Sequence, residues 1–278
     1  MAEAARQASP MPTGRPKVSF QGVEKVYRAA SGGREPTRAL DAFDLQIVPG
    51  EIVSIIGPTG CGKSTALNIL AGFEQATAGV VRVDDEIVTG PGRNRGVVFQ
   101  QPSLFPWMSV LDNVVLGVKC RGGDPTAYGP RALELLAEVG LAGFERHYPY
   151  QLSGGMQQRV QIARALIGEP DILLMDEPFG ALDYQTRLLM QKLLLRLWAH
   201  FRPTILFITH DVGEAIFISD RVIAMTRRPG RVKLAVEVHA PKPRDYEFLG
   251  SPEFIRLEHE LVLAVQGEVE GREAEAAH

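Results

Sequence analysis

A glycine-rich run that directly follows a short apolar segment constrains this chain more than any other feature. The apolar segment is Val53-Ser54-Ile55-Ile56, and the run is Gly57-Pro58-Thr59-Gly60-Cys61-Gly62-Lys63-Ser64, here called the phosphate loop. The segment predicts a strand buried on both faces, and residues 63–72 predict a helix. The run fits GxxxxGK[ST], in which backbone N–H groups and a helix N-terminus hold phosphate groups. By itself this pattern predicts a nucleotide binder, because kinases, GTPases and helicases share it.

The residues of the phosphate loop have separate expected roles. Glycines allow the backbone N–H groups to turn inward around the phosphates. Lys63 is expected to reach the β- and γ-phosphates, Ser64 to take a Mg²⁺ position, and Thr65 to donate to the α-phosphate. Cys61 has two interpretations: a redox-sensitive thiol whose pKa is lowered near a helix N-terminus, or a small residue that fits the loop. We favour the second.

Two acids end a second apolar strand. The run is Ile172-Leu173-Leu174-Met175-Asp176-Glu177-Pro178. At a strand end beside the phosphates, Asp176 is expected to hold Mg²⁺ through water and Glu177 to polarise the attacking water as general base. Alone, the pair would also fit an ordinary solvated strand end. The phosphate loop upstream makes the catalytic interpretation the stronger one.

Strand and helix patterns alternate along the chain, which predicts a parallel, doubly wound α/β core. Between about residues 101 and 166 the strand signals fade, so we expect a mostly helical insertion there. Residues 1–16 predict a disordered tail, 29–37 a loop and 266–278 a flexible tail. Predicted strands are 18–27, 43–48, 53–57, 80–83, 96–99, 172–175, 205–209 and 221–225, and predicted helices are 63–72, 131–139, 186–200 and one that starts at Ser251.

Composition excludes several classes of protein. The formal net charge is −3, which argues against broad electrostatic binding of nucleic acid. The chain has two cysteines, too few for a disulfide framework, and this fits a reducing compartment. No apolar run approaches the roughly 18 residues that span a bilayer. If the protein works at a membrane, we expect another chain to do the spanning.

A third motif decides between the nucleotide-binding classes. The run Leu152-Ser153-Gly154-Gly155-Met156-Gln157-Gln158-Arg159 precedes a helical stretch, here called the signature segment. It resembles the LSGGQ signature of the ATP-binding cassette family, with Met156 in place of the usual Gln. A Ser followed by two glycines at a helix start suits an anion, although the tetrapeptide alone would fit an N-capped helix without a ligand.

The resemblance extends to four further positions. Gln100 matches the Q-loop glutamine that contacts Mg²⁺, Asp183 in Ala181-Leu182-Asp183 matches the D-loop, and His210 matches the switch histidine near the γ-phosphate. Tyr27 matches the aromatic residue that stacks on adenine, the alternative being a strand-end aromatic that packs on the core. The resemblance implies a P-loop NTPase (RecA-like) α/β core over residues 17–265, with an antiparallel β subdomain and an inserted α-helical signature subdomain.

The resemblance also implies partners. Two chains would bind Mg-ATP head to tail, so that Ser153, Gly154 and Gly155 of one subunit close on the phosphate loop of the other. Membrane permease subunits would dock near the Q-loop, where Leu104-Phe105-Pro106-Trp107-Met108 suits either a partner-binding surface or burial inside the helical subdomain.

A narrower resemblance, to the ATPase subunits of nitrate, sulfonate and taurine importers, rests on three runs and the Phe-Pro-Trp after the first. It implies a substrate-binding protein as an indirect partner, a place at the cytoplasmic face of the inner membrane, and a small anion or sulfonate as cargo. An exporter subunit and a soluble non-transport ATPase stay open as alternatives. The runs are Gly90 to Gln100, Asp176 to Asp183 and Arg228-Pro229-Gly230-Arg231.

Overall fold

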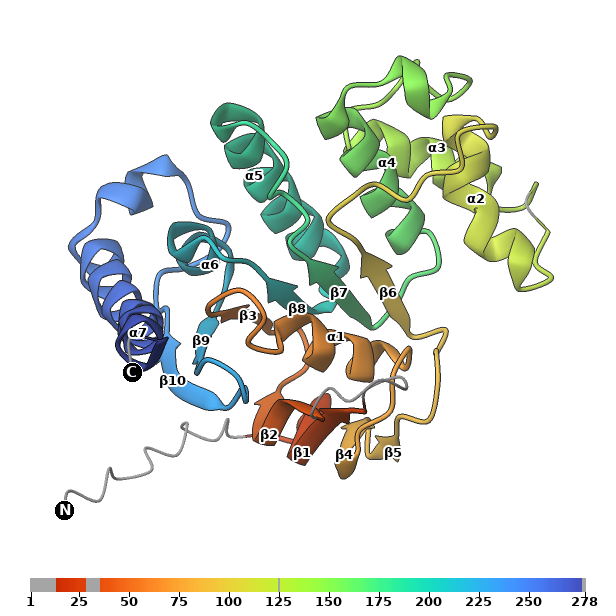
Figure 1. Cartoon of the computed structure of the whole chain (residues 1–278). Coiled ribbons are helices and arrows are strands. Elements are labelled where there is room, and N and C mark those ends of the chain that lie inside the picture. Colours follow the sequence, from red (N-terminus) through yellow and green to blue (C-terminus); the bar gives the residue numbers. More distant parts are fainter. Residues whose placement is uncertain (1–13, 29–35, 125, 277–278) are drawn as a thin grey trace. The chain divides into compact units, whose positions relative to one another are not determined.

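The computed structural model describes residues 14–28, 36–124 and 126–276, which form two compact units (Figure 1). Unit 1 comprises Met1–Pro91, Ile208–Ala240 and Tyr246–His278, and unit 2 comprises Gly92–Phe207 and Pro241–Asp245. The chain therefore leaves unit 1 after Pro91 and returns to it at Ile208. The predicted catalytic residues are divided between the two units.

An antiparallel sheet forms one part of unit 1. Its strand order is β2-β1-β4-β5, and the strands are β1 (Val18–Tyr27), β2 (Thr37–Ile47), β4 (Ala78–Val83) and β5 (Glu86–Ile87). Buried and exposed residues partly alternate along β2, as expected of a strand with one solvated face. Phe20 and Phe43 meet edge to face across β1 and β2, with their ring centroids 5.4 Å apart. This sheet confirms the antiparallel β subdomain.

The second part of unit 1 carries the phosphate loop. Strand β3 (Ile52–Ile56) is buried along its whole length and pairs in parallel with β9 (Arg221–Met225), which pairs antiparallel with β10 (Val232–Glu237). Helix α1 (Lys63–Ala71) follows the phosphate loop, and α6 (Val212–Ile218) precedes β9. The loop thus lies at the carboxyl end of a fully buried parallel strand, where α/β proteins bind ligands.

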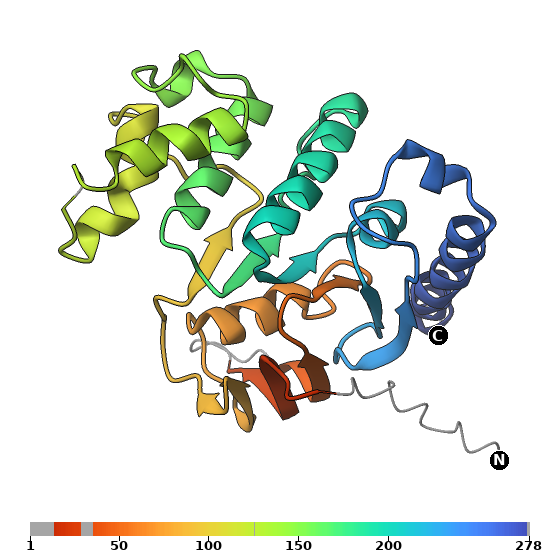
Figure 2. The ribbon, with the colours of Figure 1, turned by 180° about the vertical axis from the view of Figure 1, so that it is seen from behind.

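The long C-terminal helix α7 (Pro252–Ala276) packs on this part of unit 1 (Figure 2). Its buried residues Phe254, Leu257 and Leu261 share one apolar cluster with residues of α6 and β9. The helix continues past Gln266, where the sequence predicted a flexible tail. Within that extension the Glu268 carboxylate accepts a hydrogen bond from the backbone N–H of Arg227, at 2.8 Å.

Unit 2 combines strands with a helical region. Strands β8 (Thr204–Ile208, whose last residue belongs to unit 1), β7 (Ile172–Asp176) and β6 (Arg95–Val98) are neighbours in that order, and β6 pairs with β7 in parallel. Helices α2 (Val110–Cys120), α3 (Gly129–Glu138) and α4 (Gly154–Leu166) lie in the predicted helical range 101–166, and α5 (Tyr184–Phe201) follows β7. None of the helices within the described part of the chain is long and apolar enough to cross a membrane.

Several elements differ from the sequence prediction. Strand β2 begins at Thr37, upstream of the predicted 43–48, because the polar residues at its start find partners far along the chain: Asp41 is buried and paired with Arg231. Strand β10 was not predicted, since its burial pattern lacks a clear alternation. The short elements β5 and α6 were not predicted either, and α2 was expected only as part of the helical range 101–166. Most of the predicted tail 1–16 and of the predicted loop 29–37 lies outside the described residues.

Candidate active site

The phosphate loop adopts a backbone that only glycine tolerates at several points. The φ angles of Gly60 and Gly62 are +78° and +112°, in the region that side chains rarely adopt. A Cβ atom on Gly62 would approach the carbonyl oxygen of Ala39 to 2.8 Å, closer than real Cβ atoms come. The glycines are therefore required by backbone geometry and by the close approach of β2 behind the loop.

The N-terminus of α1 is open toward the loop. Its N-cap is Gly62, and no side chain there accepts a hydrogen bond from the first-turn N–H groups. Lys63 is only 6% exposed, and its ammonium donates to the carbonyl oxygens of Gly57 at 2.8 Å and Pro58 at 3.1 Å. Ser64 and Thr65 follow in the first turn of the helix. A buried cation and a helix dipole at one point make a strong site for an anion.

Cys61 is held inside the loop as an uncharged thiol. The residue is 1% exposed, and burial raises the pKa of its thiol, although Lys63 nearby opposes that rise. A thiolate at neutral pH is thereby disfavoured. The geometry supports the interpretation of Cys61 as a small packing residue and gives no support to a redox switch.

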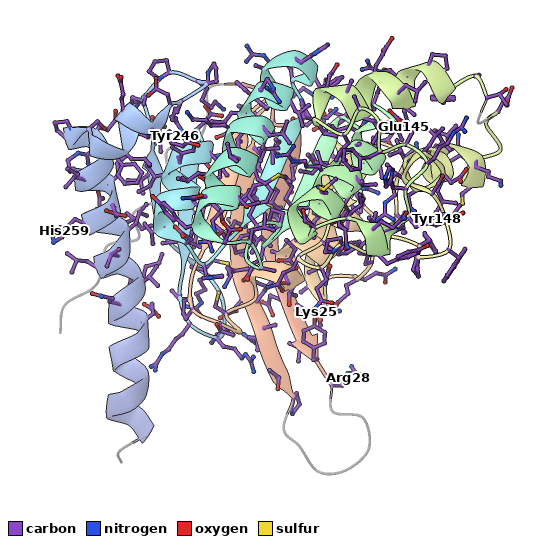
Figure 3. All side chains as sticks on the ribbon, turned by 90° about the horizontal axis from the view of Figure 1, so that it is seen from above. Lys25, Arg28, Glu145, Tyr148, Tyr246 and His259 are labelled. Atoms are coloured by element: carbon purple, nitrogen blue, oxygen red, sulfur yellow. The ribbon has the colours of Figure 1, made fainter. Side chains whose placement is uncertain are left out.

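Tyr27 ends β1 beside the first turn of α1. Its hydroxyl donates to the Glu74 carboxylate at 2.6 Å and lies 3.3 Å from the Thr65 hydroxyl oxygen, and the Lys25 ammonium lies 5.0 Å from the ring centre (Lys25 is labelled in Figure 3). Partial burial and the Glu74 carboxylate raise the pKa of Tyr27. The side chain is 38% exposed, so it does not pack in the core. Sequence reasoning missed Glu74, which no motif marks.

His210 lies on an exposed turn after β8, at the carboxyl end of β3. The backbone N–H of Thr209 donates to the carbonyl oxygen of Ile55 at 3.3 Å, and the N–H of Asp211 donates to the Thr209 hydroxyl at 3.0 Å. These bonds fix the backbone on both sides of His210. Since Ile55 lies two residues before the phosphate loop begins, unit 1 brings the predicted switch histidine and the loop to the same strand end.

The predicted catalytic acids belong to unit 2. Asp176 is the last residue of β7, and Glu177 follows it with a φ angle of +45°. A non-glycine residue in that region stores about 1–3 kcal/mol of strain, which is typical of functional positions. The Gln100 side-chain amide lies 3.5 Å from the Glu177 carboxylate and donates to it. The structure thus brings together the predicted Q-loop glutamine and the predicted general base.

The predicted magnesium ligands are oxygen donors of the kind that Mg²⁺ prefers. They comprise the Ser64 hydroxyl, the Gln100 amide and the Asp176 carboxylate, and Mg²⁺ commonly completes its shell with water and substrate phosphates. Among the described residues no group of three or more His, Cys, Asp or Glu side chains forms a metal site. This donor set fits a cation that arrives with a nucleotide better than a permanently bound metal.

The signature segment and the D-loop adjoin within unit 2. Ser153 is the N-cap of α4 and its hydroxyl accepts from the N–H of Met156 at 3.3 Å. Asp183 is the N-cap of α5 and accepts from the N–H of Thr186 at 3.0 Å, a bond that lowers the pKa of its carboxyl. A Cβ atom on Gly155 would lie 2.8 Å from the Thr186 side chain. The two helix starts are therefore packed together, and Gly155 is required for that contact.

Side chains of α4 also hold the Q-loop. The Gln158 amide donates to the carbonyl oxygen of Phe99 at 3.3 Å, and the Arg164 guanidinium donates to the carbonyl oxygen of Ser103 at 2.7 Å. Gln100 lies between these two anchors. A movement of α4 would consequently reach the Gln100 backbone directly. Sequence reasoning placed Gln158 only within the signature segment and gave it no role.

Comparison with known proteins relates this chain to one family. The profile of a family described as ABC transporter matches residues 40–180. The nitrate import ATP-binding protein NrtD of Synechocystis is 43% identical over 92% of this chain and 98% of its own length. The taurine import ATP-binding protein TauB of Yersinia pestis is 50% identical over 70% of this chain and 76% of its own length. A solved dimer of the ATP-binding cassette MJ0796 in a post-hydrolysis state, bound to ADP and Pi, is 37% identical over 81% of this chain and 100% of its own, with a TM-score of 0.70.

Proposed function

Because this chain belongs to the ABC transporter family and is an ABC ATPase, the ATP-binding subunit of a transporter, we propose that it energises import of a small anion or sulfonate through a membrane permease. The chemistry is hydrolysis of Mg-ATP. The cargo never enters this subunit, so binding and hydrolysis must be converted into movement of a partner. We propose that the chain works peripherally, at the cytoplasmic face of the inner membrane.

In the proposed reaction each predicted residue has one task. Lys63, Ser64 and Thr65 bind the phosphates and the magnesium that accompanies them, and Tyr27 stacks on the adenine. Asp176 and Gln100 would help to hold the Mg²⁺, whose charge would stabilise the phosphates. Glu177 accepts the proton of the attacking water, and His210 contacts the γ-phosphate. The bond from Gln100 to Glu177 supports this assignment, since it orients the base within unit 2.

We further propose that two chains share each ATP. The signature residues Ser153, Gly154 and Gly155, with Asp183 beside them, would contact the nucleotide bound by the phosphate loop of the second copy. ATP then joins the subunits, and loss of the γ-phosphate releases them. The dimeric state of the post-hydrolysis cassette MJ0796 supports the proposal.

Exposed aromatic side chains on unit 2 are the observation that supports binding to a membrane partner. Trp107 is 73% exposed, and Phe105 meets it edge to face with ring centroids 5.4 Å apart. Tyr148 (labelled in Figure 3) and Tyr150 stack at 5.7 Å and are exposed as well. Exposed aromatic side chains are enriched where proteins bind partners. This exposure favours the partner-binding interpretation of the Phe105–Trp107 segment over burial.

The segment that presents Trp107 is held rigidly. Asn113, fully buried in α2, donates through its amide to the carbonyl oxygens of Phe105 at 3.2 Å, Met108 at 3.1 Å and Ser109 at 3.0 Å. Its amide oxygen accepts from the Phe105 N–H at 2.8 Å. One buried side chain thus fixes the loop without covering the tryptophan. A preformed loop that exposes an aromatic residue suits docking of a permease.

The class of cargo follows from the relatives. NrtD is named for nitrate import and TauB for taurine import, and both substrates are small molecules that carry an anionic group. Because the ATPase subunit does not bind cargo, this part of the proposal depends on the resemblance alone. The class of cargo is therefore tested by measuring which ligand the substrate-binding protein binds, and not by experiments on this chain.

The proposal is tested by affinity purification of the tagged chain from its native membranes in mild detergent. We expect a polytopic permease in equal amount, and expect Trp107→Ser to lose it. Leu263→Ser, a change at an exposed residue of α7, is the matched control and should retain it. Recovery of a permease that exports its substrate when reconstituted, or of soluble partners or nucleic acid alone, would contradict the importer proposal while leaving the ATPase activity untouched.

A further inference from the structure

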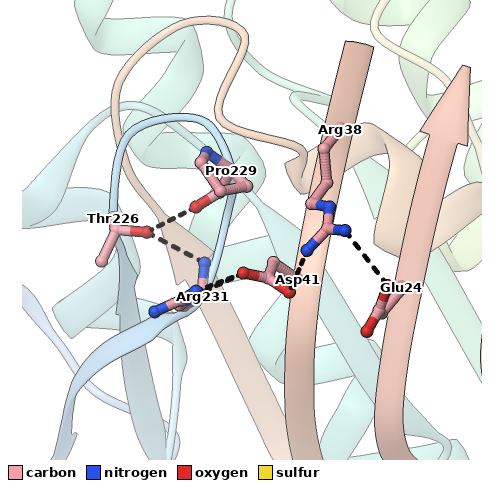
Figure 4. A network of polar contacts seen from close by, with 6 residues as sticks. All are labelled: Glu24, Arg38, Asp41, Thr226, Pro229 and Arg231. Carbon is pink, nitrogen blue, oxygen red and sulfur yellow. Dashed lines mark hydrogen bonds and ion pairs between the residues drawn. The ribbon is translucent and has the colours of Figure 1, made fainter. Parts of the chain in front are cut away.

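The loop between β9 and β10, residues 226–231, is fastened to β2 within unit 1. The Gly230 N–H donates to the Ala39 carbonyl oxygen at 2.9 Å, and the Asp41 N–H donates to the Gly230 carbonyl oxygen at 3.1 Å. The Arg231 guanidinium donates through Nε to the Asp41 carboxylate at 3.0 Å, and the Thr226 hydroxyl bonds back to the loop (Figure 4). The position of the loop is therefore fixed from the side of β2.

The same loop, residues 226–231, packs directly against the phosphate loop. A Cβ atom built on Gly230 would lie 2.1 Å from the carbonyl oxygen of Cys61 and 2.5 Å from the Met225 side chain. No residue other than glycine fits there. This contact places Arg228, two residues earlier, beside the tip of the phosphate loop.

Arg228 is bonded to that tip. Its Nε and Nη2 atoms each donate to the carbonyl oxygen of Gly60, both at 3.2 Å. The Gly60 carbonyl and the Cys61 N–H belong to one planar trans peptide, so they point in opposite directions. Holding the oxygen toward Arg228 turns the N–H toward the loop interior, where it donates to the Pro58 carbonyl oxygen at a long 3.3 Å. A weakly bonded donor of this kind is ready for a phosphate oxygen.

This peptide needs an outside restraint. Gly60 has a φ angle of +78° and no side chain, and glycine visits several backbone regions at little cost. Without Arg228, this peptide would be held mainly by the long bond from the Cys61 N–H to the Pro58 carbonyl oxygen, and its N–H would turn away from the loop interior more easily. Arg228 thus restrains the orientation of this peptide, which Gly60 cannot do because it has no side chain.

We propose that Arg228 is a positioning residue for nucleotide binding, which fixes the Gly60–Cys61 peptide so that its N–H faces the phosphates. The inference rests on the proposed phosphate-binding role of the loop and deepens it. It concerns a residue that sequence reasoning quoted only as part of the Arg228-Pro229-Gly230-Arg231 run. The role belongs to binding and not to the chemical step.

A competing effect is the positive charge of Arg228. That charge acts within the loop, because it opposes the rise in the pKa of the Cys61 thiol that burial causes. Three variants separate the two effects. In Arg228→Gln the amide nitrogen occupies the place of Nε and donates without charge. Arg228→Lys keeps the charge together with a donor, and Arg228→Met is as long as the glutamine but has neither charge nor donor.

The experiment measures the Kd of a non-hydrolysable ATP analogue, together with KM and kcat of ATP hydrolysis. Arg228→Met removes both donors to Gly60. We expect Kd and KM to rise about three- to tenfold, as for the loss of one hydrogen bond between the Cys61 N–H and a phosphate, with kcat within about twofold of wild type. Arg228→Gln should restore most of the affinity. Thermal unfolding without nucleotide should be unchanged, and Arg256→Met, a change at an exposed arginine of α7, should affect none of these quantities.

Two results would overturn the inference: unchanged affinity in Arg228→Met, or an Arg228→Gln variant as weak as Arg228→Met while Arg228→Lys binds normally. The second result would show that binding requires the positive charge at position 228 and is not supported by an uncharged donor there. Lys63→Ala, measured in parallel, reports on the phosphate loop itself. If Lys63→Ala loses affinity and Arg228→Met does not, only the inference about Arg228 fails. If Lys63→Ala binds the analogue normally, the phosphate-binding role fails, and the inference fails with it.

Discussion

Two helix N-termini in this chain carry the two predicted phosphate-binding motifs, and they are built differently. The N-cap of α1 is Gly62, which has no side chain to cap the first N–H groups, and the buried Lys63 follows it. The N-cap of α4 is Ser153, whose own hydroxyl accepts from the Met156 N–H. The first arrangement has no side-chain cap, whereas in the second a side-chain hydroxyl already accepts a hydrogen bond from one of the first-turn N–H groups.

This difference assigns ATP binding by the single chain to one helix start and closure of the two-chain dimer to the other. The phosphate loop has its cation, helix dipole and glycine backbone assembled within unit 1, so a single chain is expected to bind ATP there. The signature segment has no cation among Ser153, Gly154 and Gly155, so we expect it to hold a phosphate only when a partner presents one. The comparison therefore predicts that changes at α1 weaken binding by the single chain, while changes at α4 weaken turnover by the pair.

The largest expected effect comes from the base in unit 2. In Glu177→Gln the side chain keeps its size but no longer accepts a proton, so kcat should fall by about 10²- to 10⁴-fold. Binding of ATP should persist and should hold two chains together, which size-exclusion chromatography with and without ATP would detect. Hydrolysis at the full rate would remove Glu177 from the catalytic role.

Lys63→Ala should separate the two N-termini most sharply. Loss of a buried ammonium that binds phosphate should weaken ATP binding by at least about tenfold, because charge-assisted hydrogen bonds contribute about 1.5–3 kcal/mol. Fluorescence titration of the monomer with a nucleotide analogue measures this affinity. Retention of wild-type affinity would mean that α1 is not the primary binding site.

Ser153→Ala should give the opposite pattern. Turnover should fall while the affinity of the monomer for ATP stays within about twofold of wild type, and loss of the N-cap should reduce the free energy of unfolding by about 1 kcal/mol. Steady-state kinetics, monomer titration and denaturant unfolding test the three parts. An equal loss of binding and turnover would break the distinction between the two helix starts.

The smallest effect expected is a difference in reactivity between the two cysteines. Cys61 is buried and its raised thiol pKa keeps it protonated, whereas Cys120 is exposed. At pH 8, alkylation of Cys61 should be much slower than that of Cys120, and it should accelerate as the pH rises toward the elevated pKa. Mass spectrometry of the modified chain resolves the two sites, and equal rates would argue for an accessible thiolate in the phosphate loop.

Local patterns predicted those parts of the molecule that local chemistry determines. The strand before Gly57 and the helix that follows the phosphate loop were predictable because their apolar and glycine patterns lie in adjacent residues. The acids at the end of β7 were predictable for the same reason. The signature segment was interpretable only through its resemblance to a family, since a capped helix start looks the same with or without a ligand.

The partners of several residues were not predictable, because they come from distant parts of the chain. Glu74 bonds Tyr27, Gln158 bonds Phe99, and Arg228 bonds Gly60. The residues of these three pairs are separated in sequence by 47, 59 and 168 positions, respectively. No local period or motif joins such residues, and only the folded topology brings them together. The roles of Glu177, Lys63 and Ser153 are predictions that the variants above test.

The central claim is that each ATP is shared between Lys63 of one chain and Ser153 of its partner. Mixing the Lys63→Ala chain with the Ser153→Ala chain tests it directly, because a head-to-tail mixed dimer contains one site in which both residues are intact. The account predicts that the mixture hydrolyses ATP faster than either variant alone, approaching about a quarter of the wild-type rate with random pairing and independent sites. A mixture no more active than the mean of the two separate variants would contradict it.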